Sequence, residues 1–209
     1  MNLLRLLFLF SMLTSTANAQ SEVKWLNQNL VPFSIDSAND EINELKKLKK
    51  YIGDSRIVLL GEQTHGDGAT FETKVKLVKY LHQQMGFTVL AFESNQYNVE
   101  IAWEDVLQNK SPMSALQRST HPIWGEAKEM QPLFEYLIEK SGGENPMQIS
   151  GFDCQALGKY FRNDFKDDFI AYLEEKKINF ADSVKQNSFF RLLDEILYNA
   201  EYQNIRNKA

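Results

Sequence analysis

The chain of 209 residues has little of several things that often define a protein's class. It has one cysteine, Cys154, so no disulfide can form within the chain and its stability has to come from packing. After the first 19 residues, no stretch reaches the roughly 20 apolar residues that a membrane-spanning helix needs. Nor is there an excess of basic residues, because the formal charge is -5 and both signs are interspersed. This charge argues against nucleic acid or an acidic membrane as the main partner.

The first 19 residues differ from the rest of the chain. Arg5 precedes an apolar run from Leu6 to Leu13, and the small residues Ala17 and Ala19 follow. This pattern predicts a secretory signal peptide over residues 1–19, cleaved after Ala19. We therefore expect an exported protein, periplasmic or secreted and not bound to a membrane, whose residues 20–209 form one domain.

Residues 56–94 are predicted to form a strand, a helix and a second strand. The run Arg56–Leu60 is rich in branched apolar residues and too short for a helix, which predicts a buried strand. Between Phe71 and Met85, apolar residues recur at spacings of three and four, which predicts an amphipathic helix that Gly86 ends. Thr88–Phe92 is the second strand-like run.

This order implies that the two strands are parallel and joined by a crossover. Glu62 and Glu93, each just past the end of its strand, would then lie on the same edge of the sheet. Open α/β sheets bind ligands at that edge. A third short strand is predicted to end near Gly151, so Asp153 would join the two glutamates.

The remaining segments are predicted to be mostly helical. Apolar residues at helical spacing occur in residues 98–108 and 130–138, and again from about Lys159 to the end of the chain. The fold class that we expect is α/β, a parallel-sheet core with helices on both faces and helical additions.

Glu62 and His65 suggest one kind of chemistry. A carboxylate held in a cleft, with an imidazole three residues later, can supply the proton acceptor and the positioned donor that ester hydrolysis requires. Gly61, Gly66 and Gly68 let the backbone turn sharply and approach a ligand closely.

Two other interpretations of the same residues remain open. Imidazole and carboxylates are an ordinary set of ligands for a divalent metal, although a single histidine in the cluster favours the absence of a metal over zinc. Alternatively, the turn is only structural: Glu62 caps a helix or pairs with a lysine, and His65 is a hydrogen-bonded loop residue.

Several linked segments, spread over residues 40–208, resemble the erythromycin esterase family. They are LGEQTHG, a helix that opens with Phe71 and Glu72, the strand GFTVLAFES, the HPIW segment and GFDCQ. The resemblance implies an erythromycin esterase-like α/β domain that hydrolyses a macrolactone or another carboxylic ester with an activated water and without a serine nucleophile. We expect no cofactor. Such an enzyme would act on a small-molecule ester, and resistance to macrolide antibiotics is one activity of the family.

The resemblance also implies roles for particular residues. The implied catalytic residues are Glu62, His65, Glu72 and Glu93. The implied substrate-binding residues are Thr64, Gly66, Trp124 and Asp153, and Tyr97 would join Trp124 in an apolar wall.

The chain departs from the family at its end. Family members continue through a further strand to a pair of histidines, one of which is the expected general base, and neither His82 nor His121 is in such a pair. We therefore expect this domain to be incomplete at the C-terminus and inactive in ester hydrolysis as the 209-residue chain alone.

Two alternative functions come from related folds. One is a haem- or metal-binding protein with an LGE-x-x-H turn and no catalysis, a family whose members usually have a lipid-anchored cysteine after the signal peptide. No cysteine follows Ala19 here. The other is a metal-dependent peptidase related at the superfamily level.

Overall fold

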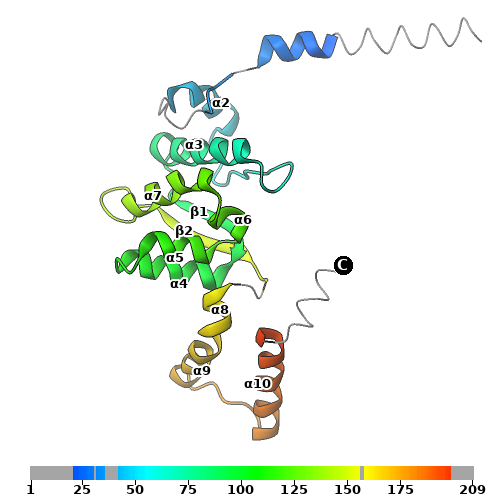
Figure 1. The fold of residues 1–209 in the computed structure, drawn as a ribbon, viewed down its shortest axis with the longest axis vertical. Coiled ribbons are helices and arrows are strands. Elements are labelled where there is room, and N and C mark those ends of the chain that lie inside the picture. Colours follow the sequence, from blue (N-terminus) through cyan, green and yellow to red (C-terminus); the bar gives the residue numbers. More distant parts are fainter. Residues whose placement is uncertain (1–20, 31, 36–41, 156–157, 199–209) are drawn as a thin grey trace, which may run out of the picture.

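The computed structural model describes residues 21–30, 32–35, 42–155 and 158–198 (Figure 1). The predicted signal peptide therefore lies outside the described residues. Residues 21–29 are helical, and η1 (Ile42–Lys47) and α2 (Leu48–Ile52) follow. The central part of the chain contains α3 (Gly68–Met85), β1 (Val89–Asn95), α4 (Gln96–Leu107), α5 (Pro112–Ser119), α6 (Pro122–Gly125), η2 (Lys128–Met130), α7 (Gln131–Glu139) and β2 (Gln148–Asp153). The last described elements are α8 (Lys159–Asn163), α9 (Phe165–Glu175) and α10 (Ser183–Tyr198).

The two strands β1 and β2 form a parallel pair, with α4 to α7 in the connection between them. This arrangement confirms the predicted parallel sheet and the α/β class. Phe92 and Ile149 are buried, whereas the alternate side chains of Val89 and Phe152 are exposed, so one face of the sheet is covered more fully than the other.

The pairing becomes irregular between Phe92 and Asn95, opposite Gly151. An added Cβ on Gly151 would lie 2.4 Å from the carbonyl oxygen of Ser94 and 2.8 Å from Cα of Gln96. Only a glycine lets the two backbones approach this closely.

The prediction of a strand at Arg56–Leu60 is wrong. Among the described residues the sheet has two strands, and this run is in neither of them. Ile57 and Leu59 are 77% and 90% exposed, whereas Leu60 is half-buried against the hydrophobic core. An apolar run becomes a strand only where a neighbouring strand offers backbone N–H and C=O groups, and here none does.

The helix α3 begins and ends as its sequence dictates. The Asp67 side chain accepts hydrogen bonds from the backbone N–H of Ala69 (3.2 Å) and the hydroxyl of Thr70 (2.7 Å), which caps the first turn. At the other end, Gly86 has a φ of +75° and donates its N–H to the carbonyl of His82. The predicted helix and its terminating glycine are therefore confirmed, with a start three residues earlier than Phe71.

The hydrophobic core lies where α3, α4, α5 and α7 meet the sheet. Its members are buried apolar side chains from these elements and from the α6 to η2 segment: Phe71, Val75, Val99, Ala102, Leu116, Trp124, Met130, Leu133, Phe134 and Ile149, among others. His82 is also buried, where it hydrogen-bonds the Tyr136 hydroxyl (2.6 Å) and the carbonyl of Asn145 (3.1 Å). Such pairing is what a buried imidazole requires.

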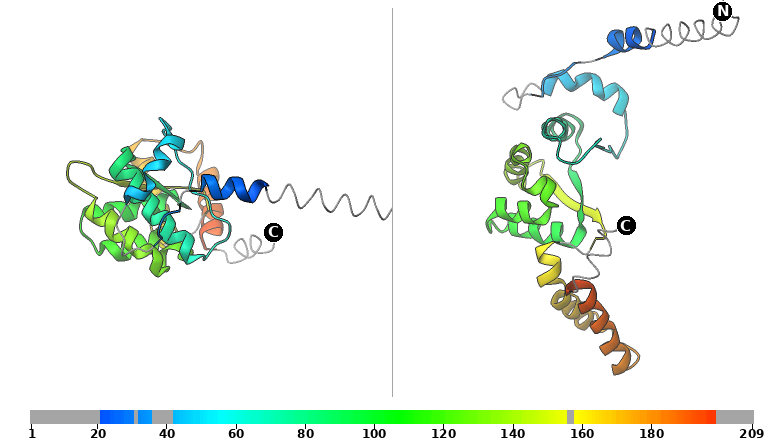
Figure 2. Two further views of the ribbon diagram at one scale, coloured as in Figure 1. Left: turned by 90° about the horizontal axis from the view of Figure 1, so that it is seen from above. Right: turned by 45° about the vertical axis from the view of Figure 1, so that its right-hand side comes forward.

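Figures 1 and 2 both show that the helices α8 to α10 extend away from the part of the chain that contains the sheet. Their contacts are largely aromatic: Phe161 stacks on Phe165, and Phe165 on Phe169, with ring centroids 4.5 and 5.9 Å apart. Phe169 in turn contacts Phe189 of α10 at 5.8 Å. The prediction of helices from about Lys159 onward is thus confirmed up to Tyr198, except for residues 176–182 between α9 and α10, and residues 199–209 lie outside the described residues. The aromatic side chains of these helices pack against each other.

Within the described ranges, every helix is too short or too polar to cross a bilayer.

Candidate functional site

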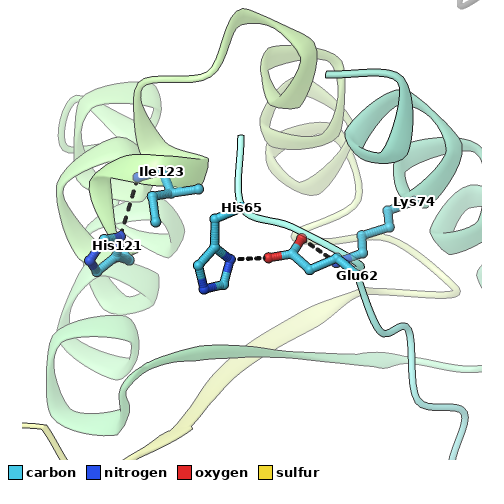
Figure 3. Close-up of polar contacts among 5 residues, drawn as sticks. All are labelled: Glu62, His65, Lys74, His121 and Ile123. Atoms are coloured by element: carbon cyan, nitrogen blue, oxygen red, sulfur yellow. Dashed lines mark hydrogen bonds and ion pairs between the residues drawn. The ribbon is translucent and has the colours of Figure 1, made fainter. Parts of the chain in front are cut away.

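The turn between Gly61 and Asp67 brings three side chains together (Figure 3). The Nδ1 atom of His65 is hydrogen-bonded to Oε1 of Glu62, and the second carboxylate oxygen of Glu62 accepts a hydrogen bond from Lys74 Nζ at 2.7 Å. The Glu62 side chain is only 10% exposed, whereas that of His65 is 56% exposed. The carboxylate is thus held from both sides, and the imidazole is accessible.

Opposing effects set the pKa of Glu62. Burial raises it, but the hydrogen bonds from Lys74 and His65 and their positive charges lower it, and the net effect is a pKa below the ordinary value of a glutamate. Glu62 is therefore ionised at neutral pH and accepts the Nδ1 proton of His65. The other ring nitrogen, Nε2, has no hydrogen-bond partner among the described residues.

Trp124 connects this turn to a second histidine. Its indole ring makes edge-on contacts with the rings of His65 (centroids 6.1 Å apart) and His121 (5.9 Å). Two hydrogen bonds fix His121. Its ring Nδ1 accepts one from the backbone N–H of Ile123 at 3.3 Å (Figure 3), and its backbone N–H donates the other to the Ser94 hydroxyl at 3.0 Å. Trp124 itself is buried in the core, so both imidazole rings pack against a side chain whose position is fixed.

A cavity of about 650 Å³ opens at the carboxyl ends of β1 and β2. Glu93 and Asp153 both line it, together with His121 and residues from α4, α5 and α8. The prediction that these two carboxylates share one edge of the sheet is confirmed. The prediction that Glu62 joins them at this edge is wrong, because Arg56–Leu60 is outside the sheet and Glu62 is not among the residues that line the cavity. His65 is not among them either.

The other predicted residues are placed as follows. Thr64 and Gly66 lie on the exposed turn, and the φ of +83° at Gly66 explains the glycine. Glu72 is half-buried on α3, and none of the contacts found for His65 involves it. Asp153 accepts a hydrogen bond from the N–H of Gln155 at 3.0 Å.

Tyr97, the other residue of the expected apolar wall, lies outside the cavity lining and hydrogen-bonds Asp168. Burial, together with this bond, raises the pKa of its hydroxyl well above the ordinary value. Its ring contacts Phe165 at 5.2 Å, so it packs against α9.

The interpretation of the turn as structural predicts that Glu62 pairs with a lysine and that His65 is a hydrogen-bonded loop residue, and the structure shows both contacts. The sequence did not identify the lysine as Lys74, although Asp67, Thr70 and Lys74 recur at spacings of three and four and thus share one side of the helix start. Arg118 and Lys159, which line the cavity, were not predicted. No group of three or more His, Cys, Asp or Glu side chains in the described part of the chain is arranged to hold a metal ion.

Comparison with known proteins identifies the family. The sequence model of the erythromycin esterase family matches residues 82–208, more than half of the chain. The chain belongs to the erythromycin esterase family. The match covers the strands, the cavity and α8 to α10, while the Glu62–His65 turn precedes it.

Two relatives of this family member have descriptive names. It is 35% identical over 156 residues to a Bacillus subtilis (strain 168) protein named "Putative hydrolase YbfO", an alignment that covers 73% of this chain and 34% of that protein. It is 34% identical over 70 residues to erythromycin esterase type II of Escherichia coli, which covers 34% of this chain and 17% of that protein.

Two crystal structures are similar to the model. One is a Bacillus cereus protein, with a TM-score of 0.58, 28% identity and coverage of 73% of this chain and 36% of that one. The other is a succinoglycan biosynthesis protein, with a TM-score of 0.59, 28% identity and coverage of 75% and 41%. The chain thus spans about a third of the length of the first relatives that it matches.

Proposed function

We propose that the protein is a hydrolase of carboxylic esters, a lactone among them, in which His65 activates the attacking water. His65 then has the role of general base that the family resemblance assigns to a histidine of the downstream pair, and this replaces the expectation that the 209-residue chain is inactive by itself. The observation that supports this proposal most directly is the pairing of His65 with an ionised, fixed Glu62, which leaves Nε2 as the accessible base. This is the arrangement of a general base and its orienting carboxylate.

The reaction balances without a further reactant. Nε2 of His65 takes a proton from water as the water oxygen bonds to the ester carbonyl carbon. Collapse of the tetrahedral intermediate breaks the bond to the alkoxide oxygen, which receives that proton from the imidazolium. Glu62 stabilises the positive charge on His65 between the two steps.

The names of two relatives agree with this chemistry, since one is called an esterase and the other a hydrolase. Glu93 and Asp153, at the ends of the strands, would hold the substrate through hydrogen bonds to its hydroxyl groups. The roles of Glu72, Thr64 and Gly66 that the family implies belong to the same proposal.

The test is hydrolysis of erythromycin and of simple aryl esters by purified protein and by variants of the turn. His65→Asn is expected to lower kcat/KM by about 10² to 10⁴, because proton transfer by a positioned base contributes that much. Glu62→Gln should lower it as well, since a neutral amide stabilises the imidazolium less. Glu72→Gln tests the role that the family implies for this residue.

Glu135→Gln is the matched control, because Glu135 is an exposed glutamate on α7, outside the turn and the cavity. Hydrolysis that His65→Asn leaves unchanged would contradict the proposal, whatever the substrate.

We also propose that this chemistry takes place after export, on the strength of the Arg5 to Ala19 pattern. The mature protein is then expected to begin at Gln20. N-terminal sequencing of the protein recovered from the cell exterior or periplasm checks this, and an intact Met1 there would contradict it.

A further inference from the structure

Most residues that line the cavity at the strand ends have charged, amide or hydroxyl side chains, while carbon atoms make up most of the exposed surface of the lining. The cavity can therefore take a ligand that combines apolar surface with polar or charged groups.

Among the described residues, the lining contains acidic and cationic side chains in equal number. The acidic side chains Glu93 and Asp153 come from the two strands, and Glu126 comes from the residue that follows α6. The cationic side chains Arg118, Lys159 and Arg162 come from the end of α5 and from α8. The side of the cavity that these two helices form is thus cationic.

Contacts between the helices hold this cationic side in place. Arg118 hydrogen-bonds the hydroxyl of Tyr160, and that hydroxyl donates to Asp105 of α4 at 2.9 Å. The N–H of Phe161 donates to the Asn98 side chain at 2.7 Å, which fixes α8 against α4. The positions of Arg118 and Lys159 along the cavity follow from this packing.

Within the described residues, neither Arg118 nor Lys159 is in an ion pair with a carboxylate. Other lysines of the chain do have such partners, for example Lys166 with Asp194 at 2.6 Å and Lys74 with Glu62 at 2.7 Å. Two cations that face one cavity without a carboxylate partner among the described residues suit an anionic ligand, because a charge-assisted hydrogen bond is about twice as strong as a neutral one.

We propose that the cavity selects esters that bear an anionic group, a carboxylate or a phosphate, which Arg118 and Lys159 bind. The inference rests on the proposed ester hydrolysis and names its substrate class. The hydroxyl groups of the same substrate would face Glu93 and Asp153. His65 is not among the residues that line the cavity, so the ester would extend from the cavity past His121 toward His65. The rings of both histidines contact Trp124.

Three acetyl esters with the same acetylated carbon and a different terminal group, a hydroxymethyl, a phosphate or a carboxylate, test this selection: 1-acetylglycerol, 1-acetylglycerol 3-phosphate and 3-O-acetylglycerate. The kcat/KM of at least one anionic ester is expected to exceed that of the neutral ester by about tenfold or more. Which anionic ester is preferred identifies the group as a phosphate or a carboxylate. Lys159→Gln should reduce the ratio of anionic to neutral kcat/KM, mainly through a higher KM for the anionic ester.

Lys110→Gln is the matched control, since it removes the same charge from an exposed lysine outside the cavity. It should leave the ratio unchanged. Equal kcat/KM for all three esters, or a preference that Lys159→Gln and Lys110→Gln change to the same extent, would overturn the inference while leaving ester hydrolysis intact.

A binding measurement separates the inference from catalysis. Glycerol 3-phosphate, glycerate and glycerol are titrated calorimetrically into the wild-type protein and the two lysine variants. At least one anion should bind about tenfold more tightly than glycerol, and this preference should weaken in Lys159→Gln. If neither anion binds better than glycerol, the inference is wrong even where esters are hydrolysed.

Discussion

The segments Val89–Asn95 and Arg56–Leu60 are both short and rich in branched apolar residues, and each contains or precedes a glutamate of the site. The first pairs with β2 and buries Phe92 in the core, whereas the second has no strand beside it and exposes Leu59. The difference lies in the neighbour and not in the segment. It also changes how the two glutamates are positioned.

Glu93 is within β1, so the hydrogen-bonded backbone of the sheet fixes its position at the cavity. Glu62 has no such support and depends on Lys74 and His65. A carboxylate of the candidate site can thus be fixed by secondary structure or by side-chain partners. The second arrangement requires further residues, here Lys74 and His65, to be correctly placed. The following substitutions test how far this contrast holds.

The largest expected effect is in the core. Phe92→Ala should lower the free energy of unfolding by about 3–5 kcal/mol, because Phe92 is only 7% exposed and its loss leaves a cavity. Leu59→Ala should change it by no more than about 0.5 kcal/mol. Urea denaturation measures both, and a comparable loss in Leu59→Ala would show that the Arg56–Leu60 run is buried in solution.

Two glycines provide a second matched pair. Gly151→Ala is expected to destabilise the protein by about 1–3 kcal/mol, since its Cβ would overlap the backbone at Ser94 and Gln96, which would have to shift. Gly61→Ala meets nothing within 4 Å and should be neutral or stabilising by less than about 1 kcal/mol. Thermal unfolding of the two variants side by side checks the difference, and equal melting temperatures would contradict the close approach of β1 and β2.

The smallest effect concerns the support of Glu62. Lys74→Gln should cost about 1 kcal/mol of stability at neutral pH, because the ion pair is partly exposed. The pKa of Glu62 should rise in the variant, since one of the groups that lower it is removed. An NMR titration of the carboxyl carbon measures this directly.

The sign of the linked pH effect follows from the lowered pKa. In the wild type, the stabilisation from ionised Glu62 is present above the pKa of an unfolded glutamate and is lost as the pH falls through the lower folded value. Lys74→Gln should therefore differ from the wild type most at neutral pH and least in strong acid. A stability difference that grows on acidification would contradict this account.

Local signals in the sequence predicted the elements that depend on local chemistry. The spacing of Phe71, Val75 and Val78 with Gly86 beyond them predicted α3, and the direction of parallel strands predicted that Glu93 and Asp153 meet. The Arg56–Leu60 run was mispredicted because composition describes what a segment can do and not whether a partner strand is present.

The same limit applies to the site. Glu62 and His65 are three residues apart, so their contact could be predicted from the sequence. The cationic side of the cavity requires α5 and α8 to meet, although Arg118 and Lys159 are far apart in the sequence. Such a contact is set by tertiary packing, which the spacing of apolar residues does not specify.

The lone cysteine, Cys154, is exposed directly after Asp153, at the end of β2. A thiol-reactive fluorophore would therefore attach at one known position, with a stoichiometry of one per chain and without prior mutagenesis. Placed next to a cavity residue, the dye would report on ligand entry as a change in emission. The unmodified protein thus contains its own labelling position for screening candidate ligands.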